Sequence, residues 1–478
     1  MTPHATDSVS KVLRLAALLC LAGTLLAQDP PAQPEATPEA DAPAASAPVT
    51  AWFVRRAYTV SGAPVDNAVI VVTGDKITAV GPEASVEIPA GATRMEKRSW
   101  MATPGFVHPA AQFFGTSERM ELSGSVLKGD EVLRGRLDPS VTEVRQLAES
   151  GFTTVALFPS GGGVPGMISL VKPVPVAKTL PDVAALVRDD RAALALGFEP
   201  GTATREFMIK TLAQARKYIS DLEAFQKGGA KPEAKPAETK PEEAKPAETK
   251  PAEAKAAEAK PAEAAKEGEK KPEEPKKEAA KEPTQDPKLM PLVEALRAKL
   301  PAVLALTSAA ALLHAEPIFA AEVAFRPALL FTGMPMRGGP DLWRVLPQLK
   351  RLGFTVVLSP QLSQVPFVAT RRCTQVMLLD AGIPLALLAD QRAPGGLAEF
   401  RAQVLDLIRH GMDPNDALRS CTQTPADVLG LGASVGALAV GRNADVLLFD
   451  GEPFAPATRL VQVIVGGTQI YSASKEDN

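Results

Sequence analysis

The sequence predicts an α/β protein whose strands gather at both ends of the chain and alternate with helices between those ends. Short β-branched runs separated by turn residues follow residue 51, and similar runs return over 461–471. Over 104–227 and 289–432, apolar runs of strand length alternate with segments of helical periodicity. This order indicates an α/β protein with strand-rich segments at both ends of the chain.

The composition is that of a globular protein with a large core. Of 478 residues, 45% are apolar and 22% are charged, and the net charge is −3. A charge this close to balance argues against a nucleic-acid partner. No CxxC or Cys/His zinc spacing occurs, so Cys373 and Cys421 are expected as small buried residues, and a disulfide between them stays open.

The first residues read as a secretory signal. Lys11 and Arg14 precede the apolar run Leu15–Ala27, which is too short to span a bilayer comfortably. We expect a signal peptide at 1–27, export to the periplasm or the extracellular space, and no membrane span after cleavage. Lipidation at Cys20 and a retained N-terminal anchor remain alternatives. The Pro/Ala/Glu-rich stretch 28–50 is expected to be a disordered tether.

The folded part is expected to begin with strands over 51–103. Val69–Thr73 and Lys76–Val80 flank Gly74-Asp75, as in a β-hairpin. Pro104-Gly105 then breaks the pattern, and Phe106-Val107 reads as the start of a buried strand.

Helices and strands follow in alternation. Residues 152–171 show a β-loop-β pattern with a glycine-rich loop, which lacks the spacing of a phosphate-binding motif. Helices are expected at Asp138–Ser150, Thr202–Gln226, Leu292–Lys299, Ser308–Val323 and Leu342–Leu352, and strands at Phe152–Phe158, Pro301–Leu306, Pro327–Phe331, Thr355–Pro360 and Pro384–Asp390.

Residues 228–288 differ from the rest of the chain. A ten-residue Lys/Glu/Pro/Ala repeat runs in tandem from Ala234 to Glu263. Prolines block a continuous helix, and apart from proline no apolar side chain larger than alanine is present in the repeat to build a core. We expect a disordered insert within the α/β part that acts as a solvated spacer, with contact to peptidoglycan or an envelope partner as the alternative.

Several motifs resemble the amidohydrolase superfamily, and its imidazolonepropionase-like branch in particular. Met101–Gln112, MATPGFVHPAAQ, resembles the family's first barrel strand, PG-aliphatic-aliphatic-Asp-x-His-x-His. His410–Leu431 is similar to "GlspxeALraaTxnpAxxLGl", Gly436–Asp450 to "GsLxxGkdADlvvld", and Val461–Tyr471 to the closing strands "VxxVxVxGxxvY".

The resemblance implies a (β/α)8 TIM-like barrel and a small β-sandwich. The barrel would comprise 104–227 and 289–432, and the sandwich 51–103 and 433–478. The family hydrolyses non-peptide C–N bonds, or prolyl dipeptides in some branches, with zinc or a similar divalent metal held largely by histidines.

This sequence departs from the family at the histidine positions. His108 stands at the position of the family's Asp, Ala110 and Gln112 at those of its first two His, and Ala305 and Thr332 at those of later ligands. Asp390, at the end of the expected last barrel strand, matches the family's terminal Asp and is the candidate catalytic general base.

The sequence therefore predicts no metal site and no cofactor. It has 4 His in all; of these, His314 and His410 fall on expected helices. Because residues i and i+2 of a strand share a side, His108 is expected on the same side as Ala110 and Gln112, and His108 and Gln112 are candidate binding residues. Asp445 is expected to bind backbone amides at a turn.

Two hypotheses follow for function. The first is an exported pseudo-hydrolase whose barrel binds a small-molecule ligand or an envelope protein. The second is an active amidohydrolase that cleaves amides, lactams or dipeptides with Asp390 in an unconventional site that includes His108 and Gln112.

Overall fold

The computed structural model describes residues 47–116, 122–175, 182–228, 283–319, 322, 324–332, 341–365, 370–390 and 396–473. From Ala47 onward the chain forms one compact unit. The expected signal segment, most of the expected tether and residues 229–282 of the expected insert lie outside the described residues, so the predictions made for them stay predictions. In the described part of the chain, no helix has both the length and the apolar character needed to cross a bilayer.

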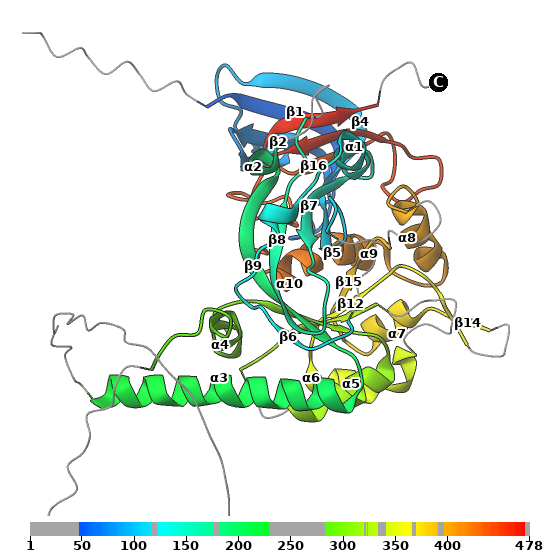
Figure 1. Cartoon of the computed structure of the whole chain (residues 1–478). Coiled ribbons are helices and arrows are strands. Elements are labelled where there is room, and N and C mark those ends of the chain that lie inside the picture. The colour runs from blue at the N-terminus through cyan, green and yellow to red at the C-terminus, as the bar shows by residue number, and fades with distance from the viewer. Residues whose placement is uncertain are drawn as a thin grey trace, which may run out of the picture. The chain divides into compact units, whose positions relative to one another are not determined.

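Eight strands form the barrel sheet, in the order β15-β12-β11-β10-β9-β8-β7-β5 (Figure 1). All neighbours are parallel except β8, which runs antiparallel to β7 and β9 and confirms the β-loop-β prediction. The outermost strands β5 and β15 contact each other, so the sheet is nearly closed. The strands are β5 Phe106–Ala111, β7 Phe152–Leu157, β8 Gly163–Val171, β9 Val187–Phe198, β10 Ala302–Leu306, β11 Ala328–Phe331, β12 Val356–Leu358 and β15 Leu385–Leu387, and the short β6 Val126–Leu127 pairs with β8.

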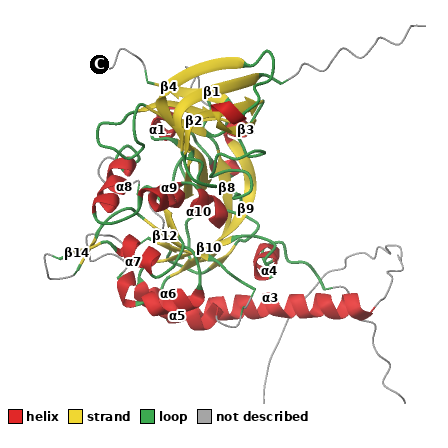
Figure 2. Cartoon of the chain, turned by 180° about the vertical axis from the view of Figure 1, so that it is seen from behind, coloured by secondary structure: helices red, strands yellow, loops and turns green. Residues whose placement is uncertain are grey.

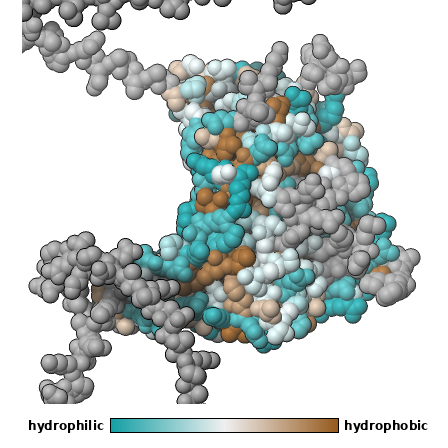
Figure 3. Space-filling view, viewed as in Figure 1, coloured by the Kyte–Doolittle hydropathy of each residue, from teal (hydrophilic) through white to brown (hydrophobic). Residues whose placement is uncertain are grey.

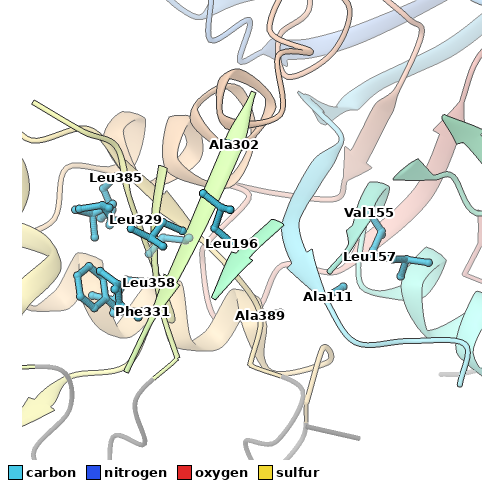
Figure 4. Close-up of a cluster of buried hydrophobic side chains, with 14 of the residues drawn as sticks. Ala111, Val155, Leu157, Leu196, Ala302, Leu329, Phe331, Leu358, Leu385 and Ala389 are labelled. Carbon is cyan, nitrogen blue, oxygen red and sulfur yellow. The ribbon is translucent and has the colours of Figure 1, made fainter. Parts of the chain in front are cut away.

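Helices cover the outer face of this sheet (Figure 2). Leucine and phenylalanine side chains from the strands meet apolar helix residues there in one large buried cluster, part of which is drawn in Figure 4. The helices are α1 Val141–Glu149, α2 Val183–Leu186, α3 Thr202–Gly228, α4 Met290–Leu296, α5 Ala309–Phe319, α6 Leu346–Leu352, α7 Thr374–Asp380 and α8 Phe400–Arg409; 3-10 turns η2 Arg134–Arg136 and η4 Leu342–Arg344 and the strand pair β13 Ser363–Gln364 and β14 Arg371–Arg372 lie in the connections.

The start of α1 shows how local sequence fixes a boundary. Ser140 accepts a hydrogen bond from the backbone N–H of Glu143, and the Glu143 side chain accepts one from the N–H of Ser140. This capping box satisfies two N–H groups that the helix itself leaves without partners. The helix ends before Gly151, which has a φ of 83° that glycine adopts without strain.

Strands from both ends of the chain join in a second sheet, with the order β18-β17-β16-β4-β1-β2-β3. This confirms that the N- and C-terminal segments build one β module. The expected hairpin is present, with Thr73 opposite Lys76. The strands are β1 Val49–Ala57, β2 Val65–Thr73, β3 Lys76–Pro82, β4 Thr93–Pro104, β16 Val446–Phe449, β17 Leu460–Val465 and β18 Thr468–Ser472, and a 3-10 turn η1 covers Glu83–Ser85.

Exposed apolar side chains are scattered over the surface. On the face drawn in Figure 3, small hydrophobic areas lie between hydrophilic ones. The large apolar side chains that are exposed among the described residues are Ile209 of α3, Leu313 of α5 and Val440.

Candidate functional site

The inner face of the barrel is lined by apolar side chains, many of them alanine or valine. In β10, for example, Leu304 and Leu306 belong to the outer cluster that packs on the helices, whereas Val303 and Ala305 belong to a separate inner cluster. This alternation is the period of two expected for a strand. The inner cluster includes Val107, Ala110, Ala156, Phe158, Ile168, Ala193, Ala195, Val303, Ala305, Ala328, Leu330, Val357 and Ala386.

One end of the barrel is closed by two short helices, α9 Pro414–Cys421 and α10 Gln423–Val428, which contact β5 and β15. Apolar residues of α10 join the inner cluster. Just after α10, a side chain at Gly430 would lie 2.8 Å from Pro301, which precedes β10. These helices therefore close the amino-terminal end of the strands. The carboxyl end, where barrel enzymes hold their active sites, remains as the candidate site.

His108 of β5 joins the two edges of the barrel sheet. Its Nε2 lies 2.9 Å from the carbonyl oxygen of Ala389, two residues beyond β15. Because a carbonyl only accepts, this bond requires the proton on Nε2 and leaves Nδ1 as an acceptor, which has no partner among the described residues. The side chain therefore links two strands that contact each other without a ladder of backbone hydrogen bonds.

The protonation state of His108 follows from its burial. Only 1% of the residue is exposed. Desolvation lowers its pKa from 6.5 to about 4, against smaller opposing effects of the Ala389 carbonyl and the Asp390 carboxylate. The ring is therefore neutral near neutral pH and does not serve as a proton donor to a substrate.

The expectation that His108 shares a side with Ala110 is wrong. The His108 ring lies against Phe152 of the outer cluster, with 5.4 Å between ring centroids, whereas Ala110 belongs to the inner cluster. The pairing of β5 with β7 shifts register between His108 and Ala111. Such an irregularity adds a residue on one strand and reverses the alternation beyond it, and Pro109 cannot donate to a regular ladder.

The other two candidate residues, Asp390 and Gln112, lie next to the two different strands that flank β5. Asp390 follows β15, is 9% exposed, and is close enough to His108 for its charge to act on the ring. Gln112 donates from Nε2 to the Phe158 carbonyl oxygen at 2.8 Å, beyond the end of β7. The described contacts therefore place His108 near Asp390 and tie Gln112 to β7, and a joint role of the three residues stays a prediction.

Comparisons with known proteins agree with this architecture. A model of the amidohydrolase family matches residues 365–471. Imidazolonepropionase from Rubrobacter xylanophilus is 36% identical over 100 residues, which cover 20% of this chain and 23% of the relative. Imidazolonepropionase from Shouchella clausii is 28% identical over 105 residues, which cover 22% and 23%. These matches thus span about a quarter of the length of each curated relative.

A solved structure extends the match to most of the fold. The amidohydrolase from Thermotoga maritima superposes with a TM-score of 0.65 at 18% identity, over 89% of this chain and 100% of that one. Barrel and second sheet are thus reproduced together. In sequence, residues 365–471 match the amidohydrolase family and are similar to imidazolonepropionases; over the rest of the chain the likeness is one of fold.

The positions that the sequence resemblance assigns to metal ligands carry side chains that are poor zinc ligands or cannot bind zinc. Ala110 and Ala305 lie in the apolar inner cluster and offer no lone pair. The hydroxyl of Thr332 and the amide of Gln112 are poor zinc ligands beside imidazole or carboxylate. Among the described residues, no group of three or more His, Cys, Asp or Glu side chains is placed to hold a metal ion. The side chains at these four positions therefore do not match the family's donors, and the absence of a metal site stays a prediction.

Two residues outside the barrel mouth have structural contacts. Asp445 accepts from the Gly466 N–H at 2.9 Å, as expected for a turn carboxylate, and also pairs with Lys172. His410 ends α8, where its Nδ1 lies 2.7 Å from the Asp406 carbonyl oxygen. The sequence did not reveal Lys172 as the partner of Asp445 or Ala389 as the partner of His108, because neither contact leaves a local pattern.

Proposed function

We propose that this chain is an exported member of the amidohydrolase superfamily that lacks metal-dependent hydrolysis and binds a small-molecule ligand or an envelope protein at the barrel mouth. The observation that carries the proposal is the apolar inner cluster at Ala110 and Ala305, together with the bond from His108 to the Ala389 carbonyl. Without imidazole ligands, no bound metal lowers the pKa of water to about 7. The carboxyl end of the strands still offers a site of the kind that barrels use for ligands.

An active hydrolase is the second candidate, and the position of Asp390 favours it. This carboxylate stands just beyond β15 at the carboxyl end of the barrel and is almost fully buried. A positioned general base contributes roughly 10²- to 10⁴-fold, against at least about 10⁶-fold for typical enzymes. Asp390 alone would therefore support weak turnover of amides, lactams or prolyl dipeptides.

Metal content and turnover of the purified full chain separate the two functions. The binding protein would carry far less than one equivalent of zinc, manganese or iron after purification without chelators, and would not exceed background on a panel of amides, lactams and prolyl dipeptides. Stoichiometric metal and turnover that are both lost in Asp390→Asn, but kept in the exposed control Asp380→Asn, would instead establish the hydrolase.

To test export, the full chain is expressed in a secreting host, and the N-terminal residue and the location of the product are determined. The proposal expects a mature chain that starts at Gln28 and is released from the cytoplasm. A lipid on Cys20, or recovery of residues 1–27 in the folded protein, would contradict cleavage after Ala27.

A further inference from the structure

A cavity lies on the outer face of the barrel. It has a volume of about 230 Å³ and sits between α5, α6 and the outward side chains of β10 and β11. Apolar residues form its floor and walls: Leu304, Leu312, Ala315, Phe319, Phe325, Pro327, Leu329, Leu352 and Phe354. An apolar cavity of roughly 150 Å³ already binds benzene, so this one has room for an aromatic ring and a short substituent.

The cavity lies toward the amino-terminal ends of the barrel strands, away from the barrel mouth. Pro327 directly precedes β11, and Phe354 lies two residues before β12, so both stand at the amino-terminal ends of their strands. The candidate site described above is at the carboxyl ends. The inference below is therefore independent of the proposed function.

Some charged residues at the rim of the cavity have an ion-pair partner, and Arg326 has none among the described residues. Glu316 pairs with Arg351, and Glu322 pairs with Arg216 of α3. Arg326 is exposed; its Nη1 donates to the Leu352 carbonyl oxygen at 3.0 Å, and no carboxylate among the described residues pairs with it. Since the two Glu are neutralised by their own Arg, the rim presents one uncompensated positive charge.

The Arg326 guanidinium is also held in place above the cavity wall. Its central carbon lies 5.9 Å from the centroid of the Phe354 ring, and its bond to the Leu352 carbonyl fixes one of its two amino groups. The remaining N–H groups are available to an anion at the opening. Sites with an apolar interior and a few placed polar groups are typical of small-molecule binding.

We propose that this cavity binds a small arylcarboxylate, with the ring among Leu304, Phe325 and Leu329 and the carboxylate on Arg326. Burial of the ring supplies the affinity, and the charge-assisted hydrogen bond selects an acid over its neutral or cationic analogues.

Calorimetric titration of the full chain with three phenyl probes of similar size tests this directly: the acid phenylacetate, its neutral isostere phenylacetamide and the cation phenethylamine. We expect phenylacetate to bind with one-to-one stoichiometry and about 10-fold more tightly than phenylacetamide, and phenethylamine to bind least. Chemical shifts of the Leu312 and Leu329 methyl groups should move with the titration and locate the probe.

Two variants and one control complete the test. Arg326→Gln should abolish the preference for phenylacetate over phenylacetamide, while Arg145→Gln on the exposed side of α1 should keep it. Ala315→Phe should fill the cavity and abolish binding of all three probes. If Ala315→Phe does not fold, Arg326→Gln decides alone. Equal affinity for acid and amide in the parent, unchanged preference in Arg326→Gln, or no binding of any probe would overturn the proposal.

Discussion

Lys172 and Asp445 form a buried ion pair that joins the barrel to the second sheet. Lys172 directly follows β8, Asp445 directly precedes β16, and their side chains are only 12% and 4% exposed. Asp445 also accepts from the Gly466 N–H between β17 and β18. A carboxylate that the sequence identified as a turn residue therefore also connects the two β modules.

Asp445→Asn is expected to destabilise the protein by about 3 kcal/mol, because it leaves the Lys172 ammonium buried without its counter-charge. Denaturant unfolding measures the loss. The double variant Asp445→Asn/Lys172→Met should recover a large part of it, since the uncompensated charge is then removed. Equal stability of the parent and Asp445→Asn would show that the pair does not hold the modules together.

The parent protein should lose stability in acid because its buried His108 resists protonation. Its folded pKa of about 4 lies below the ordinary 6.5, so the unfolded state takes up the proton first and the folded state loses stability as the pH falls from 6.5 to 4. Over that window the parent should lose about 3 kcal/mol more than His108→Gln, which does not titrate. Parallel pH curves for the two proteins would contradict the buried, neutral ring.

Gly105→Ala should destabilise the first barrel strand. An added methyl at this position would lie 2.0 Å from the Thr153 hydroxyl oxygen and 2.6 Å from its Cβ, and Thr153 is itself buried at the start of β7. Overpacking of this kind costs about 1 to 3 kcal/mol. Gly135→Ala is the matched control, because an added methyl there meets no atom within 4 Å.

Neither Cys373 nor Cys421 should react readily with a thiol reagent in the folded protein. Cys421 is fully buried in α9 and Cys373 is partly buried, both are free thiols, and burial raises the pKa of each. Labelling should be slow at mildly alkaline pH and complete in concentrated guanidinium chloride. An intact mass that rises by two hydrogens on reduction would instead reveal a disulfide.

The sequence was most informative where the signal is local. The turn at Gly74-Asp75 and the strand pattern of 152–171 rest on residues close in the chain, and the structure confirms both of them. The sequence did not predict strand β9, whose pairing with β8 and β10 depends on segments far along the chain.

The candidate site was harder to predict because it depends on side-chain direction. Strand periodicity placed His108 with Ala110, but a register shift in β5 turns the ring toward Phe152 and the Ala389 carbonyl. A sequence pattern cannot show such a shift, since it arises from the pairing of β5 with β7.

By itself, the sequence predicted the resemblance to the amidohydrolase superfamily and the barrel with its second β module. Only the tertiary structure decided which groups meet: the His108 ring at the barrel seam, the Lys172–Asp445 pair between the modules, and the cavity beside Arg326. The physical reason is that residue identity and local periodicity are written along the chain, whereas burial and the partners of a charge are set by segments that only the fold brings together.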